Sequence, residues 1–146
     1  MATDKFEVVH DAPMLVGEAA TWHEVESALY WVDINGHTVN RVHPASGKYS
    51  YWKMGSEPSA LAIDGDNNLI VALRSGLICL NTTTGKETPT GDAPFDTSIV
   101  RFSDGRVDPA GRFWIGTMYE PRDKPAAEMY VLERGLLRRA WAGNMT

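Results

Sequence analysis

A short unit, made of a polar turn followed by an apolar strand, occurs three times at a nearly regular spacing. The apolar strands begin at Leu29, Leu69 and Phe113, so that 40 and then 44 residues separate successive units. Strand-rich repeats of roughly 40 to 50 residues are typical of β-propeller blades. The spacing therefore predicts an all-β chain of about three blades, each a four-stranded antiparallel sheet.

Turns inside these repeats agree with this interpretation. In the first two units a Ser/Thr-Gly-Lys turn, at 46–48 and at 84–86, occupies the same place between two apolar runs. Such turns are expected where two antiparallel strands are joined in a hairpin. The chain shows no convincing helical pattern, and its 8 Pro and 13 Gly are distributed along its length, which fits many short strands. Because three blades do not close a ring, we expect exposed blade edges that favour self-association.

Composition limits the class of protein and its partners. The chain has 146 residues, of which 43% are hydrophobic and 23% charged, as in ordinary soluble globular domains. A net charge of -5 without a basic cluster argues against nucleic acid and against a membrane surface as partners. No apolar run approaches the roughly 20 residues of a membrane span, and no signal peptide begins the chain. A cytoplasmic location is therefore expected.

The single cysteine, Cys79, excludes an intrachain disulfide and fits a reducing compartment. Its apolar neighbours favour inert packing over a role as a nucleophile. The five tryptophans recur at strand positions, and we expect them to form mainly the core between blades.

Four motifs, in order and at blade spacing, resemble those of the senescence marker protein / gluconolactonase / regucalcin-like family. They read V-G-E-A-A-T-W at 16–22, L-Y-W-V-D-I at 29–34, V-R-F-S-D-G-R-V-D-P at 100–109 and G-R-F-W-I-G-T-M at 111–118. The resemblance covers Leu15 to about Trp141. It implies a six-bladed propeller, of which residues 1–146 would form the N-terminal half as an incomplete domain.

The resemblance further implies metal-dependent hydrolysis of a sugar lactone, of the gluconolactonase type, in the intact parent protein. Glu18 matches the family's metal-binding glutamate, and the divalent ion would be calcium, zinc, magnesium or manganese. The family's other two metal ligands, one of which is also its general base, belong to later motifs. This chain ends where the first of them is expected. The resemblance therefore assigns no catalytic base here, and the chain alone is expected to be inactive or nearly so.

Three residues are candidates for contact with the substrate, and the first two of them lie in a motif that resembles the family's. Arg101 can donate hydrogen bonds to a lactone through its planar fork; the alternative is a structural ion pair with Asp104 or another carboxylate. Ser103 stands where the family usually has asparagine, and its hydroxyl is shorter and offers fewer bonds. Glu120 follows the third apolar strand at the end expected to face the site, with a solvated loop residue as the alternative.

Two further departures from the family's motifs occur. Val100 replaces an asparagine, and Ala19-Ala20 replaces Gly-Pro after Glu18.

The second candidate function is a non-catalytic module that binds calcium or another protein through a propeller face. It would bind calcium tightly without hydrolysing a lactone.

Overall fold

The computed structural model describes residues 6–145, which form twelve β-strands and no helix. Blade 1 consists of β1 (Gly17–His23), β2 (Ala28–Asp33), β3 (Thr38–His43) and β4 (Lys48–Lys53). Blade 2 consists of β5 (Pro58–Ile63), β6 (Asn68–Leu73), β7 (Gly76–Asn81) and β8 (Glu87–Asp92). Blade 3 consists of β9 (Val100–Val107), β10 (Phe113–Tyr119), β11 (Ala127–Glu133) and β12 (Leu136–Met145).

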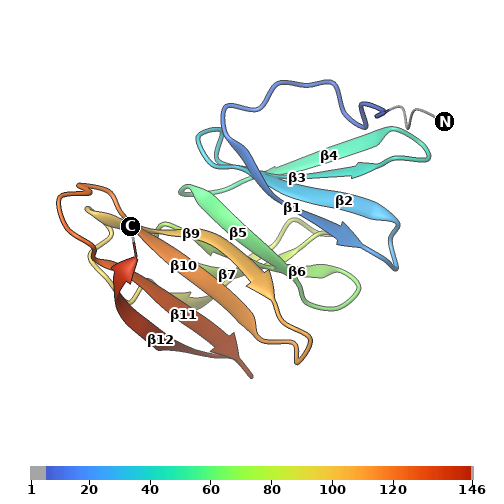
Figure 1. Cartoon of the computed structure of the whole chain (residues 1–146). Coiled ribbons are helices and arrows are strands. Elements are labelled where there is room, and N and C mark those ends of the chain that lie inside the picture. Colours follow the sequence, from blue (N-terminus) through green and yellow to red (C-terminus); the bar gives the residue numbers. More distant parts are fainter. Residues whose placement is uncertain (1–5, 146) are drawn as a thin grey trace, which may run out of the picture.

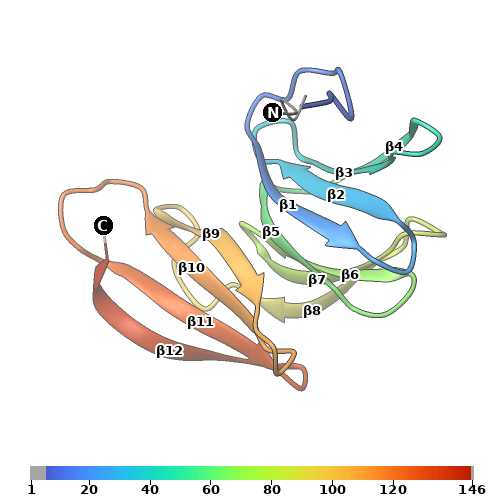
Figure 2. The ribbon, with the colours of Figure 1, turned by 45° about the vertical axis from the view of Figure 1, so that its right-hand side comes forward.

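Each blade is an antiparallel sheet in which the strands pair in sequence order. The first strands, β1, β5 and β9, lie innermost, with β5 in contact with both others. The last strands, such as β4 and β12, lie outermost (Figure 1; Figure 2). The predicted all-β architecture, with three four-stranded blades of a partial propeller, is confirmed.

One backbone hydrogen bond recurs in all three blades and gives their common register. In each blade, the residue after the second strand donates its N–H to the carbonyl of the residue before the first strand. The three pairs are Ile34 to Val16, Arg74 to Glu57 and Glu120 to Ile99, each at 2.9 Å. Glu18, Ser59 and Arg101 are therefore equivalent, because each is the second residue of an inner strand.

Two apolar clusters hold the blades together. The cluster between blades 1 and 2 includes Tyr30, Val32, Val39, Leu69, Val71, Leu73 and Leu80. The cluster between blades 2 and 3 includes Ala60, Ala62, Ala72, Leu77, Phe102, Phe113, Ile115 and Tyr130. Alternation along the strands places these side chains on the faces that meet. In β10, for example, buried and half-buried residues alternate along most of the strand.

The turn prediction is confirmed, whereas the tryptophan prediction is partly wrong. Gly47 and Gly85 adopt left-handed conformations, with φ of 68° and 73°, as tight turns between strands require. Trp31 is buried, but Trp22 and Trp141 are 47% and 45% exposed. Trp22 points away from its buried strand neighbour, His23, and Trp141 lies on the outermost strand of blade 3.

Within the described residues, no helix of membrane-spanning length and hydrophobicity occurs.

Candidate functional site

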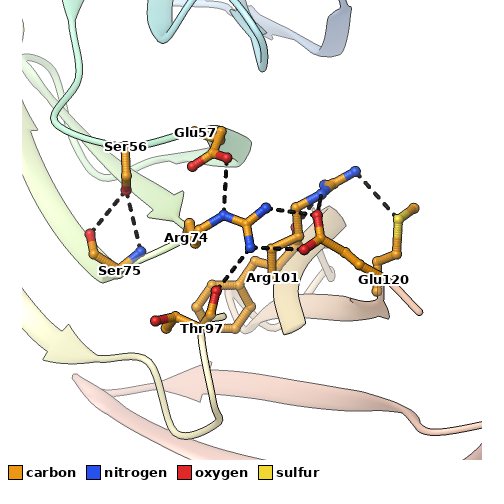
Figure 3. Close-up of polar contacts among 9 residues, drawn as sticks. Ser56, Glu57, Arg74, Ser75, Thr97, Arg101 and Glu120 are labelled. Atoms are coloured by element: carbon orange, nitrogen blue, oxygen red, sulfur yellow. Dashed lines mark hydrogen bonds and ion pairs between the residues drawn. The ribbon is translucent and has the colours of Figure 1, made fainter. Parts of the chain in front are cut away.

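Arg101 and Glu120 come together at the end of blade 3 where β9 begins and β10 ends (Figure 3). The Nε atom of Arg101 lies 3.6 Å from Oε1 of Glu120, which is too long for a hydrogen bond. Nη1 of Arg101 donates to the Phe102 carbonyl at 3.0 Å, and Nη2 lies 3.5 Å from the Met118 sulfur. The arginine side chain is only 16% exposed. Arg101 is thus a half-buried cation with one ordinary hydrogen bond to oxygen.

The carboxylate closest to Arg101 belongs to Glu120 and not to Asp104. Asp104 instead accepts a hydrogen bond from the backbone N–H of Gly105 at 2.8 Å. Arg101 thus forms the ion pair that the sequence analysis gave as the alternative, but its partner is Glu120 and not Asp104. Glu120 itself is no free loop residue, because both of its carboxylate oxygens are held by an arginine of the neighbouring blade.

That arginine, Arg74, was not predicted from the sequence. Its Nη1 and Nη2 atoms donate to the two Glu120 oxygens at 3.0 and 2.7 Å. Its Nε atom donates to Glu57 at 3.0 Å, and Nη1 also donates to the Thr97 carbonyl at 2.9 Å. The available signal was positional: Arg74 follows β6 as Glu120 follows β10. Equivalent positions in adjacent blades can face each other across the junction.

Charge in this cluster is balanced, with two arginines and two glutamates. The hydrogen bond from Arg74 is the main cause that lowers the pKa of Glu120, and the same bond raises the pKa of Arg74. Burial acts to raise the pKa of Glu57, but backbone hydrogen bonding and Arg74 together lower it below its ordinary value. The two carboxylates are therefore ionised at neutral pH.

Ser103 lies in a β-bulge on the side of blade 3 that faces away from blade 2. Phe102 pairs with Thr117 and Gly105 with Ile115, so Ser103 and Asp104 together face a single residue of β10. Bulges commonly redirect side chains next to functional sites. Ser103 lines a groove of about 920 Å³. Other residues that line this groove include Trp114, Met118, Met129, Tyr119 and Arg122.

Glu18 is exposed and follows a firmly anchored entry into β1. The Asp33 carboxylate accepts backbone N–H bonds from Leu15 and Val16 at 2.9 Å and from Gly36 at 3.0 Å. Burial acts to raise the pKa of Asp33, but these three bonds together lower it below its ordinary value. Asp33 is 5% exposed, so its charge is held inside the blade. It fixes the backbone that leads to Glu18.

The replacement of Gly-Pro by Ala19-Ala20 has a structural consequence. Ala19 adopts a left-handed conformation with φ of 56°, which favours glycine. The pairing register between β1 and β2 shifts between Glu18 and Thr21. The backbone after Glu18 thus keeps a shape suited to the glycine that this chain lacks.

The sequence predicts Glu18 as a metal ligand. Glu18 offers carboxylate oxygens, which hard divalent cations prefer. Among residues 6–145, no group of three or more His, Cys, Asp or Glu side chains is placed to hold a metal ion. In that same range Glu18 forms no ion pair with Arg101, whose ion pair is with Glu120. Glu18 and Arg101 nevertheless begin equivalent inner strands, so their positions mark the same end of blades 1 and 3.

Comparisons with known proteins agree with this architecture. The chain is 32% identical over 133 residues to a 6-deoxy-6-sulfogluconolactonase from Pseudomonas putida, covering 91% of this chain and 46% of that protein. It is 34% identical over 134 residues to regucalcin from Gallus gallus, covering 92% of this chain and 43% of that protein. The chain thus spans about half the length of the curated relatives it matches.

The solved structures and the family model lead to the same group of proteins. The crystal structure of regucalcin from Agrobacterium tumefaciens, described as a calcium-binding protein, superposes with a TM-score of 0.86 at 30% identity. The match covers 93% of this chain and 46% of that one. The family model described as "SMP-30/Gluconolactonase/LRE-like region" matches residues 16–145. The chain therefore belongs to the SMP-30/gluconolactonase/LRE-like family.

Proposed function

We propose that this chain forms the N-terminal half of a propeller that hydrolyses a sugar lactone with the help of a divalent metal ion. The observation that carries the proposal is the equivalence of Glu18 and Arg101 at the same end of two inner strands. The Glu18 carboxylate, through a bound metal ion, and the Arg101 guanidinium would then act on the same lactone at this end of the ring. Family membership and the lactonase relative support this assignment.

The chemistry asked of these residues is recognition and orientation of a cyclic ester. Arg101 has N–H groups beyond its one bond to a carbonyl, and these would donate to the oxygens of the lactone. Glu120 would accept from sugar hydroxyls, and Ser103 would donate or accept. Glu18 would supply one ligand to the metal ion, which, when bound, polarises the ester carbonyl and lowers the pKa of a water molecule.

We further propose that the 146-residue chain binds a lactone weakly but does not hydrolyse it. A calcium site takes roughly 6–8 oxygen ligands, whereas within the described part of the chain no group of three or more His, Cys, Asp or Glu side chains could hold a metal ion. Arg101 and Glu120, which would bind the sugar, lie at the start of β9 and just after the end of β10. Binding and catalysis should therefore separate in this chain.

The test joins the chain to the second half of the Agrobacterium regucalcin. The chimera and the chain alone are assayed for acid release from D-glucono-1,5-lactone with calcium, zinc, magnesium or manganese. We expect metal-dependent hydrolysis by the chimera and no enzymatic rate from the chain alone. Glu18→Gln in the chimera should reduce the rate at least about tenfold, which corresponds to about 1.4 kcal/mol.

A matched control and two outcomes give this experiment its meaning. Glu24→Gln changes an exposed glutamate of blade 1 that pairs with Trp22, and it should leave the rate unchanged. A folded chimera without lactonase activity would contradict the proposal. If that chimera binds calcium tightly, the calcium-binding candidate is favoured instead, in line with the description of the Agrobacterium protein.

A further inference from the structure

A second arginine, Arg74, binds Glu120 across the junction between blades 2 and 3. Arg74 holds both oxygens of Glu120 in a bidentate pair, at 3.0 and 2.7 Å, the strongest geometry for this type of ion pair. Glu57 and the Thr97 carbonyl fix the same guanidinium from other directions, at 3.0 and 2.9 Å. Figure 3 shows Arg74 between these partners. Arg74 is thus held in place and holds Glu120 in turn.

Arg101 competes for the same carboxylate from a longer distance. Its Nε atom lies 3.6 Å from Glu120 Oε1, whereas the Arg74 nitrogens are within hydrogen-bonding distance. The side chains of Arg74 and Arg101 are 21% and 16% exposed, so water screens them only in part. Without Arg74, Glu120 would be free to close the remaining gap and pair with Arg101 directly.

We propose that Arg74 is a positioning residue that keeps Glu120 from closing onto Arg101, so that the Arg101 guanidinium can donate to a sugar lactone. This inference rests on the function proposed above. The side chain of Arg74 need not touch the ligand itself. The direction of the effect follows from competition between the two arginines for Glu120. When Arg74 is removed, the Glu120 carboxylate pairs more strongly with Arg101.

A double-mutant cycle in the 146-residue chain tests the inference. The ligand is D-glucono-1,5-lactam, an amide analogue that resists hydrolysis, and its Kd is measured by NMR titration. Arg74→Met should raise the Kd about tenfold when Glu120 is present. In the Glu120→Gln background the same substitution should change the Kd about twofold or less, because a neutral amide competes weakly for Arg101.

The Nε–H signal of Arg101 gives a second readout that needs no ligand. Arg74→Met should move this signal downfield and slow its exchange with water, because Glu120 then bonds to it. Arg74→Lys, which keeps the charge but loses the fork, should give intermediate changes. If the Arg74→Met variant does not fold, Arg74→Lys takes its place in the double-mutant cycle. The criterion stays the same: the Kd should rise when Glu120 is present and change little in the Glu120→Gln background. Arg139→Met, which removes an exposed ion pair with Glu128, should change neither readout.

The outcomes separate the two proposals. Equal loss of affinity in both backgrounds, or an Arg101 signal that does not respond, would show a merely structural role and overturn the inference about Arg74. A wild-type chain that does not bind the lactam would overturn the proposed function and the recognition role with it. Binding by the wild type together with a cycle that shows no coupling would overturn the role of Arg74 alone.

Discussion

The two junctions between blades are built differently, one mainly from apolar packing and the other from apolar packing and ion pairs. Between blades 1 and 2, large aliphatic and aromatic side chains such as Tyr30, Leu69 and Val71 form the core. Between blades 2 and 3, small alanines pack against aromatic residues. Among the described residues, only this second junction has a network of two arginines and two glutamates, which lies at the end where β9 begins and β10 ends. Its members are Arg74, Arg101, Glu57 and Glu120. The first junction is thus a packing surface, and the second combines packing with charged groups, which we propose bind a ligand.

The largest expected effect tests the first junction. Leu69 is fully buried between blades 1 and 2, so Leu69→Ala should lower the free energy of unfolding by about 2–5 kcal/mol. The lactam affinity of the molecules that stay folded should not change, because Leu69 lies in the apolar cluster away from the charged mouth. Urea unfolding and NMR titration measure the two quantities. As a control, Leu136→Ala at a 66% exposed position should cost less than about 0.5 kcal/mol.

The anchor before Glu18 should respond to pH. Asp33→Asn puts an amide where a carboxylate accepts three backbone N–H bonds, and it should cost about 1–3 kcal/mol at pH 7. The pKa of Asp33 is lowered in the folded chain, so its stabilising contribution is present above its unfolded pKa of about 3.9. That contribution is lost as the pH falls through the folded pKa. Unfolding measured from pH 7 to pH 2 should show the two proteins converging; a constant difference would contradict this role.

The second junction should lose binding with little loss of stability. Arg101→Met removes a cation that has one bond to a carbonyl oxygen and a 3.6 Å ion pair. We expect a rise in the lactam Kd of about tenfold or more and a change in stability below about 1 kcal/mol. NMR titration and urea unfolding on the same sample check both values. A large loss of stability with unchanged affinity would make Arg101 a structural residue and remove the contrast between the junctions.

The smallest expected effect concerns the backbone next to Glu18. Ala19→Gly relieves a left-handed conformation, with φ of 56°, but glycine also increases the entropy of the unfolded chain and removes a buried methyl group. The net stabilisation should be at most about 1 kcal/mol. Thermal unfolding measures it, with Ala45→Gly at an exposed turn position as the control. A marked destabilisation by Ala19→Gly would show that the methyl group matters more than the strain.

The sequence predicts the blades well because each strand carries its own signal. The apolar runs that begin at Leu69 and Phe113 and the turn glycines are local features, and the structure places strands and turns there. Arg101 could be named from its motif, and Glu120 from its place directly after the apolar strand that begins at Phe113. Their contact, 3.6 Å across β9 and β10, follows from strand pairing within one blade.

What the sequence did not predict depends on contacts between blades or on which face of a strand is buried. Arg74 meets Glu120 across 46 residues, and this contact requires the packing angle between two sheets. The exposure of Trp22 follows from the face of β1 that it occupies, which an apolar residue type alone does not indicate. The role of Asp33 as a backbone acceptor likewise arises only when the chain before β1 folds back onto β2.

The most direct test of the central claim is a crystal structure of the chimera with Mn²⁺ and D-glucono-1,5-lactam bound. We expect the anomalous signal of manganese beside the Glu18 carboxylate. The lactam should lie within hydrogen-bonding distance of the Arg101 guanidinium, at the same mouth of the ring. A lactam bound elsewhere, or a Glu18 side chain that points away from the ligand, would contradict the account.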